Sequence, residues 1–127
     1  MPTTLRPIMR VEALQVVTTT AERKDAETLA DAVLESRLAA CVQISGPIDS
    51  RYWWNGRIEK SSEWLLTIKT RRDLYKRLER MLLEQHPYDQ PEIIGTAIAE
   101  VSAGYLKWLN EQVVVAEKDS AEKDDGK

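Results

Sequence analysis

Hydrophobic residues follow two different periods along this chain, and the change of period marks the first elements. Alternation and β-branched residues over 12–18 predict a short strand. Apolar residues at three- and four-residue spacing then predict a helix that continues to about residue 39. Thr19 and Glu22 have the spacing of a capping box at the start of this helix. Residues 41–44 are again extended, so the first third of the chain is predicted to form strand, helix and strand.

The middle of the chain predicts a long β-hairpin. Extended sequence is interrupted at Gly46-Pro47 and continues to Asn55-Gly56, a pair that favours a two-residue type I′ turn. A two-residue turn fixes the register of the aromatic strand. The predicted cross-strand pairs are Tyr52 with Glu59, Trp53 with Ile58 and Trp54 with Arg57. We expect a bulge at Ser61-Ser62, before residues 64–69, whose composition suits a central strand.

The last third of the pattern predicts a helix, a strand and a further helix. An apolar stripe predicts a second helix that begins near Thr70 and is stopped by Pro87. Residues 92–101 predict a final strand, and Ser102 is suited to cap a third helix. We expect residues 1–10 to be a flexible arm, 11–115 one folded domain and 116–127 a charged, disordered tail.

The order strand, helix, strand, strand, helix, strand predicts an α+β fold. It is the split βαβ order of ferredoxin-like βαββαβ sandwiches, here with a long hairpin and an extra C-terminal helix. Both crossover helices would cover one face of the sheet, which leaves the other face bare. We expect that face to be lined by Trp and Ile, and exposed apolar area of this kind predicts a homo-oligomer.

Composition narrows the classes of protein further. The net charge is −3, and acidic residues interrupt the one basic cluster, so we expect no nucleic-acid partner. No apolar run approaches the ~18 residues that would span a bilayer, and residues 1–10 lack the apolar core of a secretory signal. With Cys41 alone, no internal disulfide forms, which is consistent with a cytoplasmic location.

The segment from His86 to Glu92 is the strongest candidate for chemistry. Pro87 and Pro91 stiffen this connector, and His86 is the only histidine of the chain. A fixed imidazole beside a phenol and carboxylates has the donor types of a metal or small-ligand site. The alternative is a solvent-facing imidazole in the last turn of a helix.

Several stretches together resemble the CutA divalent-cation-tolerance family. They occur in the family's order: Val17 to Thr20, Leu38 to Val42, Tyr52 to Gly56, Ile68 to Thr70, His86 to Tyr88 with Pro91-Glu92, and Tyr105 to Leu109. The resemblance implies a ferredoxin-like homotrimer with a role in tolerance of copper and other divalent ions. The metal ligands that it suggests fall on Thr18, Gln85 and His86, of which only His86 has a strong donor for copper(II).

The resemblance also suggests a cleft between subunits in which several side chains would surround His86. The candidates for this cleft are Glu59, Lys69, Tyr88 and Glu92. We expect Tyr52, Trp53 and Trp54 to pack across the subunit interface, and Cys41 to be a buried, inert thiol.

Two functions follow from these residues. The first is a non-enzymatic trimer that binds copper(II) or another divalent cation weakly, since no motif of classical catalysis accompanies the single histidine. The alternative is a signalling trimer, comparable with nitrogen-regulatory PII proteins, that binds a small anion and engages a protein partner.

Overall fold

The computed structural model describes residues 12–115, and the predicted arm and charged tail lie outside this range. The described chain runs through four strands and three α-helices. In chain order they are β1 (Ala13–Thr20), α1 (Arg23–Glu35), β2 (Cys41–Trp54), β3 (Arg57–Arg71), α2 (Tyr75–Gln85), β4 (Ile94–Ala97) and α3 (Ala103–Gln112). A single 3-10 turn over Arg72–Leu74 leads into α2.

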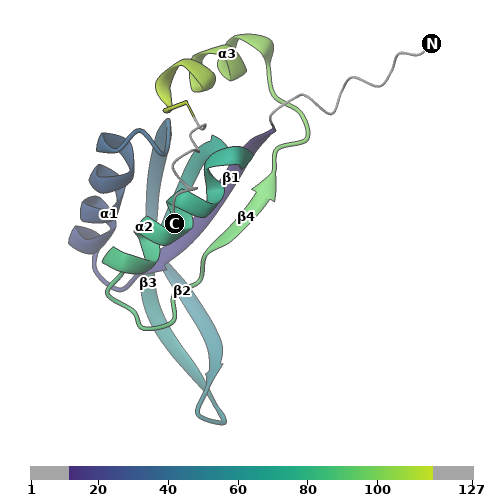
Figure 1. Cartoon of the computed structure of the whole chain (residues 1–127). Helices are drawn as coiled ribbons and strands as arrows, with labels where there is room; N and C mark the ends of the chain where they lie inside the picture. The colour runs from purple at the N-terminus through teal and green to yellow at the C-terminus, as the bar shows by residue number, and fades with distance from the viewer. Residues whose placement is uncertain (1–11, 116–127) are drawn as a thin grey trace.

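The four strands form one antiparallel sheet in the order β2-β3-β1-β4. Helices α1 and α2 lie on the same face of this sheet, and α3 lies at one end of it (Figure 1). The β2-β3 hairpin extends beyond the other end, because residues before Trp64 in β3 pair only with β2. The α+β ferredoxin-like prediction is confirmed.

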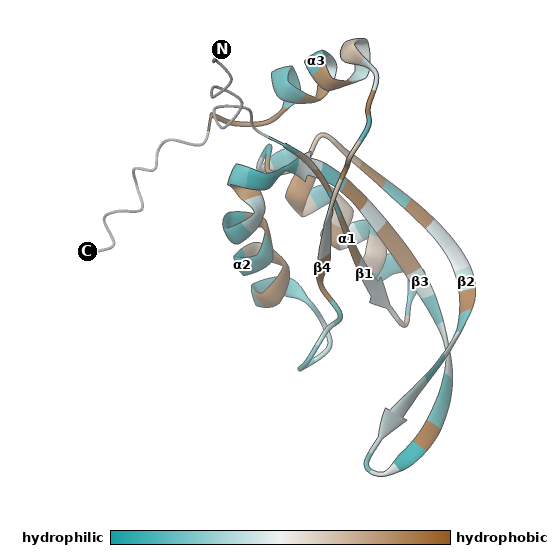
Figure 2. Cartoon of the chain, turned by 90° about the vertical axis from the view of Figure 1, so that its right-hand side faces the viewer, coloured by the Kyte–Doolittle hydropathy of each residue, from teal (hydrophilic) through white to brown (hydrophobic). Residues whose placement is uncertain are grey.

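The core lies between the sheet and the two helices. Alternate residues of the central strands point toward the helices, as the period of two requires. The fully buried members from the sheet are Val16, Leu66 and Ile68, and those from the helices are Ala26, Leu29, Val33, Leu78 and Leu82. Figure 2 shows hydrophobic stretches along β1 and β3 and along the helices α1 and α2.

The hairpin has the predicted register. Asn55 and Gly56 have φ values of 51° and 77°, as a type I′ turn requires. Trp54 pairs with Arg57, and the two further aromatic pairs follow as expected. The predicted bulge at Ser61-Ser62 is wrong, because the irregularity lies on the partner strand between Ser45 and Ile48, where the chain passes through Gly46-Pro47.

Three predicted boundaries are also wrong. Strand β1 runs through Thr20, so Glu22 is the N-cap of α1 and the Thr19 hydroxyl donates to Glu63 instead of capping the helix. Strand β4 covers only residues 94–97 of the predicted 92–101. The cap of α3 is confirmed, since the Tyr105 N–H donates to the Ser102 hydroxyl at 3.3 Å.

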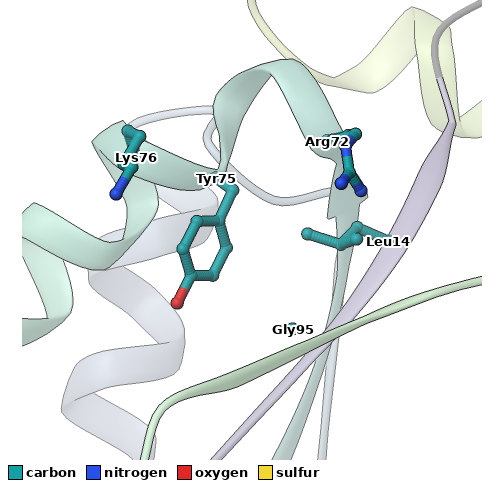
Figure 3. A pocket seen from close by; sticks show the side chains of 5 residues that line it. All are labelled: Leu14, Arg72, Tyr75, Lys76 and Gly95. Atoms are coloured by element: carbon teal, nitrogen blue, oxygen red, sulfur yellow. The ribbon is translucent and has the colours of Figure 1, made fainter.

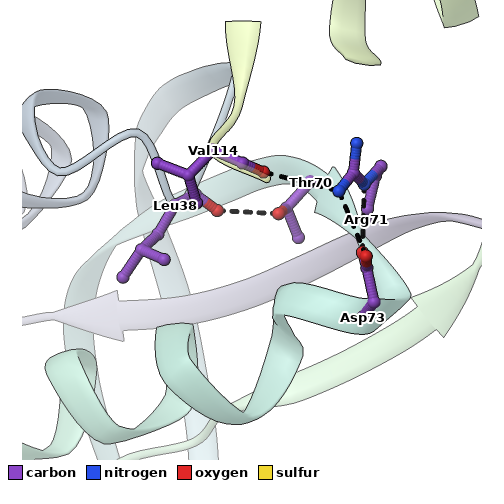
Figure 4. Close-up of polar contacts among 5 residues, drawn as sticks. All are labelled: Leu38, Thr70, Arg71, Asp73 and Val114. Atoms are coloured by element: carbon purple, nitrogen blue, oxygen red, sulfur yellow. Dashed lines mark hydrogen bonds and ion pairs between the residues drawn. The ribbon is translucent and has the colours of Figure 1, made fainter. Parts of the chain in front are cut away.

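The third boundary concerns Thr70, which ends a buried strand and does not start a helix. Its hydroxyl donates to the Leu38 carbonyl at 2.7 Å inside the protein (Figure 4). The next residue, Arg71, donates to both carboxylate oxygens of Asp73 and to the Val114 carbonyl. These bonds hold the end of β3 against the loop after α1 and the segment after α3.

Among residues 12–115 no helix or strand covers the second face of the sheet (Figure 2). Contrary to expectation, Trp64 packs against the helix-side core and does not line this face. The uncovered face carries apolar Val17, Leu65 and Ile94 beside polar Gln15 and Thr67. Within residues 12–115 no helix is long and apolar enough to cross a membrane.

Candidate functional site

His86 follows the last residue of α2 and turns the chain away from the helix. Its backbone is extended, with φ −72° and ψ 138°, because a residue before proline is displaced from helical geometry. The residue is only 9% exposed, and both ring nitrogens have partners inside the protomer, so the alternative of a solvent-facing imidazole is wrong. The sole histidine therefore belongs to the interior of the protomer.

Both ring nitrogens of His86 have partners within the protomer. The Tyr88 backbone N–H donates to Nδ1 at 3.1 Å. Since Nδ1 accepts, the neutral ring carries its proton on Nε2, which lies 3.1 Å from the Thr18 hydroxyl oxygen. The imidazole thus joins the C-terminal half of β1 to the connector between α2 and β4.

Burial lowers the pKa of His86 from its ordinary value. A hydrogen bond with the Thr19 backbone and the charges of Asp25 and Glu63 act in the opposite direction without cancelling this effect. The neutral imidazole is also the form that the Tyr88 N–H requires, because a protonated Nδ1 could not accept that bond.

A buried carboxylate completes the surroundings of the imidazole. Glu63, in β3, is 8% exposed, and its Oε2 accepts from the Tyr88 hydroxyl at 2.7 Å and from the Thr19 hydroxyl at 3.2 Å. Burial, followed by the hydrogen bond and charge of Glu63, raises the pKa of Tyr88 well above its ordinary value, so the phenol remains a donor. The rings of Tyr88 and His86 lie 5.0 Å apart between centroids.

We call Thr18, Thr19, Glu63, His86 and Tyr88 the histidine network. Of the predicted cleft residues, it contains Tyr88 alone. Sequence reasoning missed the role of Glu63, although a carboxylate directly before the mostly apolar residues 64–68 of a strand is a signal for a buried hydrogen-bonded acid.

The other three predicted cleft residues lie elsewhere in the protomer. Lys69 donates to the Gln43 side chain at 2.8 Å on the uncovered face of the sheet, and Glu92 is exposed in the connector after α2. Glu59 lies in the hairpin, ten residues before Lys69 on the same strand, a separation of about 33 Å at the usual rise. Glu59 and Tyr52 are opposite each other in the strand register, as predicted. The Tyr52 hydroxyl, however, lies 3.3 Å from Ser61 Oγ and bonds that side chain.

The structure brings two of the three suggested metal-ligand positions together. Thr18 and His86 are in contact, whereas Gln85 is exposed at the end of α2. Among residues 12–115, no three His, Cys, Asp or Glu side chains are grouped so that they could hold a metal ion. The donors of one described protomer therefore do not fit a complete metal site.

The single cysteine differs from the prediction. Cys41 is partly exposed and not the fully buried thiol that we expected.

The predicted interface residues are exposed on the hairpin. Trp53 is 72% exposed, Trp54 56% and Tyr52 43%, and Ile58 beside them is 60% exposed. Side chains of this size usually bury most of their area, so the hairpin carries an exposed apolar patch.

Comparisons with known proteins extend this description. The family model described as "CutA1 divalent ion tolerance protein" matches residues 14–112. The chain is 39% identical over 97 residues to "Divalent-cation tolerance protein CutA" of Pyrococcus horikoshii, covering 76% of this chain and 94% of that protein. It is 37% identical over 99 residues to "Protein CutA 1, chloroplastic" of Oryza sativa, covering 78% of this chain but only 56% of that protein.

The fold comparison agrees with the sequence comparison. The crystal structure of CutA1 from Oryza sativa superposes with a TM-score of 0.80 at 36% identity, covering 82% of this chain and 95% of that chain. The matched region contains every strand and helix described above except the first residue of β1.

Proposed function

This chain belongs to the CutA1 divalent ion tolerance family, and we propose that it acts in divalent-cation tolerance as a non-enzymatic homotrimer. The family match over residues 14–112 carries the proposal, since it includes the hairpin, the histidine network and α3. The chain spans about half the length of the plant relative named above, so a shared activity with that longer protein is also a proposal. We propose a cytoplasmic location, on the evidence of the single cysteine.

Self-association is supported by the surface of the protomer. The hairpin exposes three aromatic side chains and Ile58. Within the part of the chain that the structure describes, β4 pairs only with β1, which leaves its outer edge open. An open edge and an apolar arm are both features that a second copy of the chain can cover. In the trimer, Tyr52, Trp53 and Trp54 would pack against neighbouring subunits.

Copper(II) is the ion that we propose, with His86 as its nitrogen ligand. Imidazole suits copper(II), while the hydroxyl of Thr18 and the amide of Gln85 are weaker donors. Coordination requires the ring to give up either the Tyr88 N–H or the Thr18 hydroxyl as a partner. Because one described protomer lacks a three-ligand group, further donors would come from neighbouring subunits, with Glu59, Lys69, Tyr88 and Glu92 in the shared cleft.

Calorimetric titration of copper(II) into the full chain tests this proposal. We expect heat from the wild type and none above dilution from His86→Asn, whose side-chain oxygen can still accept the Tyr88 N–H. Glu84→Gln, an exposed change two residues away, is the matched control and should leave the isotherm unchanged. Circular dichroism checks that each variant is folded. Indistinguishable isotherms for wild type and His86→Asn would remove the metal role from His86.

One observation favours the second candidate, a PII-like trimer that binds a small anion and a partner protein. Both nitrogens of His86 already have hydrogen-bond partners, and the other two suggested ligand positions hold no nitrogen or sulfur donor that copper prefers. A thermal-shift screen of divalent metals against nucleotides and carboxylates separates the two functions, because a ligand that binds only the native protein raises its Tm.

A further inference from the structure

The connector between α2 and β4 is held to the protomer mainly by side chains. Residues 87–92 form no helix or strand, and Figure 1 shows them as a loop from the end of α2 to β4. Among residues 12–115, no backbone-to-backbone hydrogen bond ties 87–92 to another segment. Pro87 and Pro91 have no N–H to donate. A segment with so few backbone hydrogen bonds opens at low free energy unless its side chains fix it.

His86 lies against the part of β1 that β4 leaves uncovered. Strand β1 pairs with β3 as far as Thr20, whereas within the described residues its pairing with β4 ends at Val17 and Ile94. The His86 ring lies beside the next residue of β1, with Nε2 3.1 Å from the Thr18 hydroxyl oxygen. The imidazole is therefore held on one side by the strand and on the other by the connector.

Tyr88 is the residue that fixes the connector. Its backbone N–H donates to His86 Nδ1 at 3.1 Å, and its hydroxyl donates to Glu63 at 2.7 Å. The second bond reaches from the connector to β3, and a hydroxyl that donates to a carboxylate makes a short, strong hydrogen bond. Glu63 is buried and also accepts from Thr19, so the acceptor is itself held by the sheet.

The bond from the Tyr88 N–H occupies the reactive nitrogen of the ring. In the neutral imidazole Nε2 carries the proton, so the lone pair that binds a metal ion or attacks an electrophile is on Nδ1. The Tyr88 N–H points at this lone pair. Glu63 therefore acts on Nδ1 through Tyr88, whose hydroxyl it holds.

The ring is not reached through the pocket at the start of α2. This pocket, of about 420 Å³, is lined by Leu14, Arg72, Tyr75, Lys76 and Gly95 (Figure 3). None of these residues belongs to the histidine network. Because His86 is 9% exposed and both its nitrogens have partners, access to Nδ1 requires movement of the connector.

We propose that the hydrogen bond from the Tyr88 hydroxyl to Glu63 is a latch on the connector that controls access to His86. With the bond made, the connector is closed over the ring and the Tyr88 N–H occupies Nδ1. With the bond broken, the connector moves away and presents Nδ1 to a metal ion or an electrophile. A ligand of Nδ1 binds only the open form, so its apparent affinity falls with the fraction of open molecules. The latch concerns access to the ring alone, so it stands whether or not copper is the ligand.

The rate at which diethyl pyrocarbonate modifies the full chain at neutral pH tests this proposal. An imidazole nitrogen attacks one carbonyl carbon of the reagent, the ring proton is lost, and ethanol and carbon dioxide are released. His86 is the only histidine, so the ultraviolet absorbance of N-carbethoxyhistidine reports on one ring. We expect the wild type to react at least about tenfold more slowly than N-acetylhistidine, because a hydrogen bond to a charged group keeps most molecules closed.

Tyr88→Phe keeps the ring and the backbone N–H and removes only the hydroxyl of the latch. Its modification should be about 10- to 100-fold faster than that of the wild type. Thr19→Val is the matched control, because it removes the other hydrogen bond of the same carboxylate and leaves the Tyr88 hydroxyl in place. Its rate should be close to that of the wild type.

Hydrogen exchange separates opening of the latch from unfolding of the whole protein. In Tyr88→Phe the amide of residue 88 should exchange faster by the same factor as the modification, while the amide of Ile68, in the central strand β3, exchanges as in the wild type. Equal acceleration at Ile68 would show global unfolding and overturn the latch.

Three further results would each overturn the proposal. They are a wild type that reacts as fast as N-acetylhistidine, a Tyr88→Phe variant that reacts at the wild-type rate, and a Thr19→Val variant that reacts as fast as Tyr88→Phe. A neighbouring subunit that sealed His86 by itself would give the second result. None of these measurements uses a metal, so failure of the latch and failure of the copper function are distinguishable.

Discussion

The Thr18 hydroxyl and the His86 imidazole lie 3.1 Å apart although 68 residues separate them in sequence. Their contact joins β1 to the connector after α2, and the Tyr88 N–H holds the ring from its other nitrogen. The only histidine is thus part of the packing that closes the end of the sheet. A metal ion at His86 would compete with these two internal partners. Metal binding would therefore require the connector after α2 to rearrange locally.

The first prediction concerns stability against pH. The pKa of His86 is lower in the folded protein than its ordinary value of 6.5, so the unfolded chain binds a proton more readily. The contribution of His86 is fully present above pH 6.5 and is lost as the pH falls from 6.5 toward the lower pKa of the folded state. Urea unfolding at a fixed protein concentration should show a midpoint that declines through this range.

The control for this prediction is His86→Asn, which has no titrating ring. The variant should be less stable than the wild type at pH 7.5, and its midpoint should decline less between pH 7 and 5.5. Equal slopes for the two proteins would show that other groups, among them the nearby Asp25 and Glu63, dominate the pH response.

The second prediction compares two glycines. Gly46 has a φ of 151°, and a Cβ there would lie 2.9 Å from Trp64 Cε3 and 3.0 Å from the Glu63 carbonyl oxygen. We expect Gly46→Ala to lower the free energy of unfolding by about 1–3 kcal/mol through strain and overpacking.

The matched control for Gly46→Ala is Gly104→Ala in α3, where nothing lies within 4 Å of the new Cβ. It should be neutral or stabilise by up to about 1 kcal/mol, and chemical denaturation measures both. Equal effects would contradict the role given to Gly46.

The third prediction concerns the buried hydroxyl of Thr70. Thr70→Val keeps the shape of the side chain but leaves the Leu38 carbonyl without this donor. The expected loss is about 1–3 kcal/mol in the free energy of unfolding, because a buried acceptor then lacks its partner. Thr67→Val, three residues earlier and partly exposed on the uncovered face, is the control and should change stability by less than about 0.5 kcal/mol. A Tm of Thr70→Val equal to that of the control would refute the argument.

The sequence predicts the fold well where a local rule decides the geometry. Asn55-Gly56 fixes the turn, and the turn fixes every aromatic pair of the hairpin. Ser102 caps α3 because its side chain reaches an N–H three residues away. Thr19 shows where local rules fail: its spacing from Glu22 suits a capping box, but pairing with β3 keeps it in the strand, where it bonds Glu63. Tertiary pairing here overrides a signal that is local.

The candidate site is harder to predict, because it is assembled from segments far apart in the chain. His86 stands out in the sequence as the only imidazole, yet its burial depends on Thr18, and the acid of its network is Glu63 on a third element. These contacts between distant segments depend on the order and register of the strands in the sheet. A single sequence does not give that register for every strand.

The fourth prediction tests whether the aromatic hairpin holds the assembly together. Trp53 and Trp54 are 72% and 56% exposed in the protomer. Tryptophan is enriched among the few interface residues whose truncation costs about 2 kcal/mol or more. Sedimentation equilibrium of the wild type at micromolar concentration should give a mass of three times 14.5 kDa. The double variant Trp53→Ser with Trp54→Ser should dissociate toward single chains and lose thermal stability, since association stabilises only the folded form.

Lys60→Ser is the matched control for this prediction. Lys60 is exposed in the same hairpin and pairs with another cation, Arg51, so its removal costs no favourable cross-strand contact. A wild type that sediments as single chains, or a tryptophan variant that keeps the mass of the control, would contradict the assembly and with it every site that needs donors from a second copy.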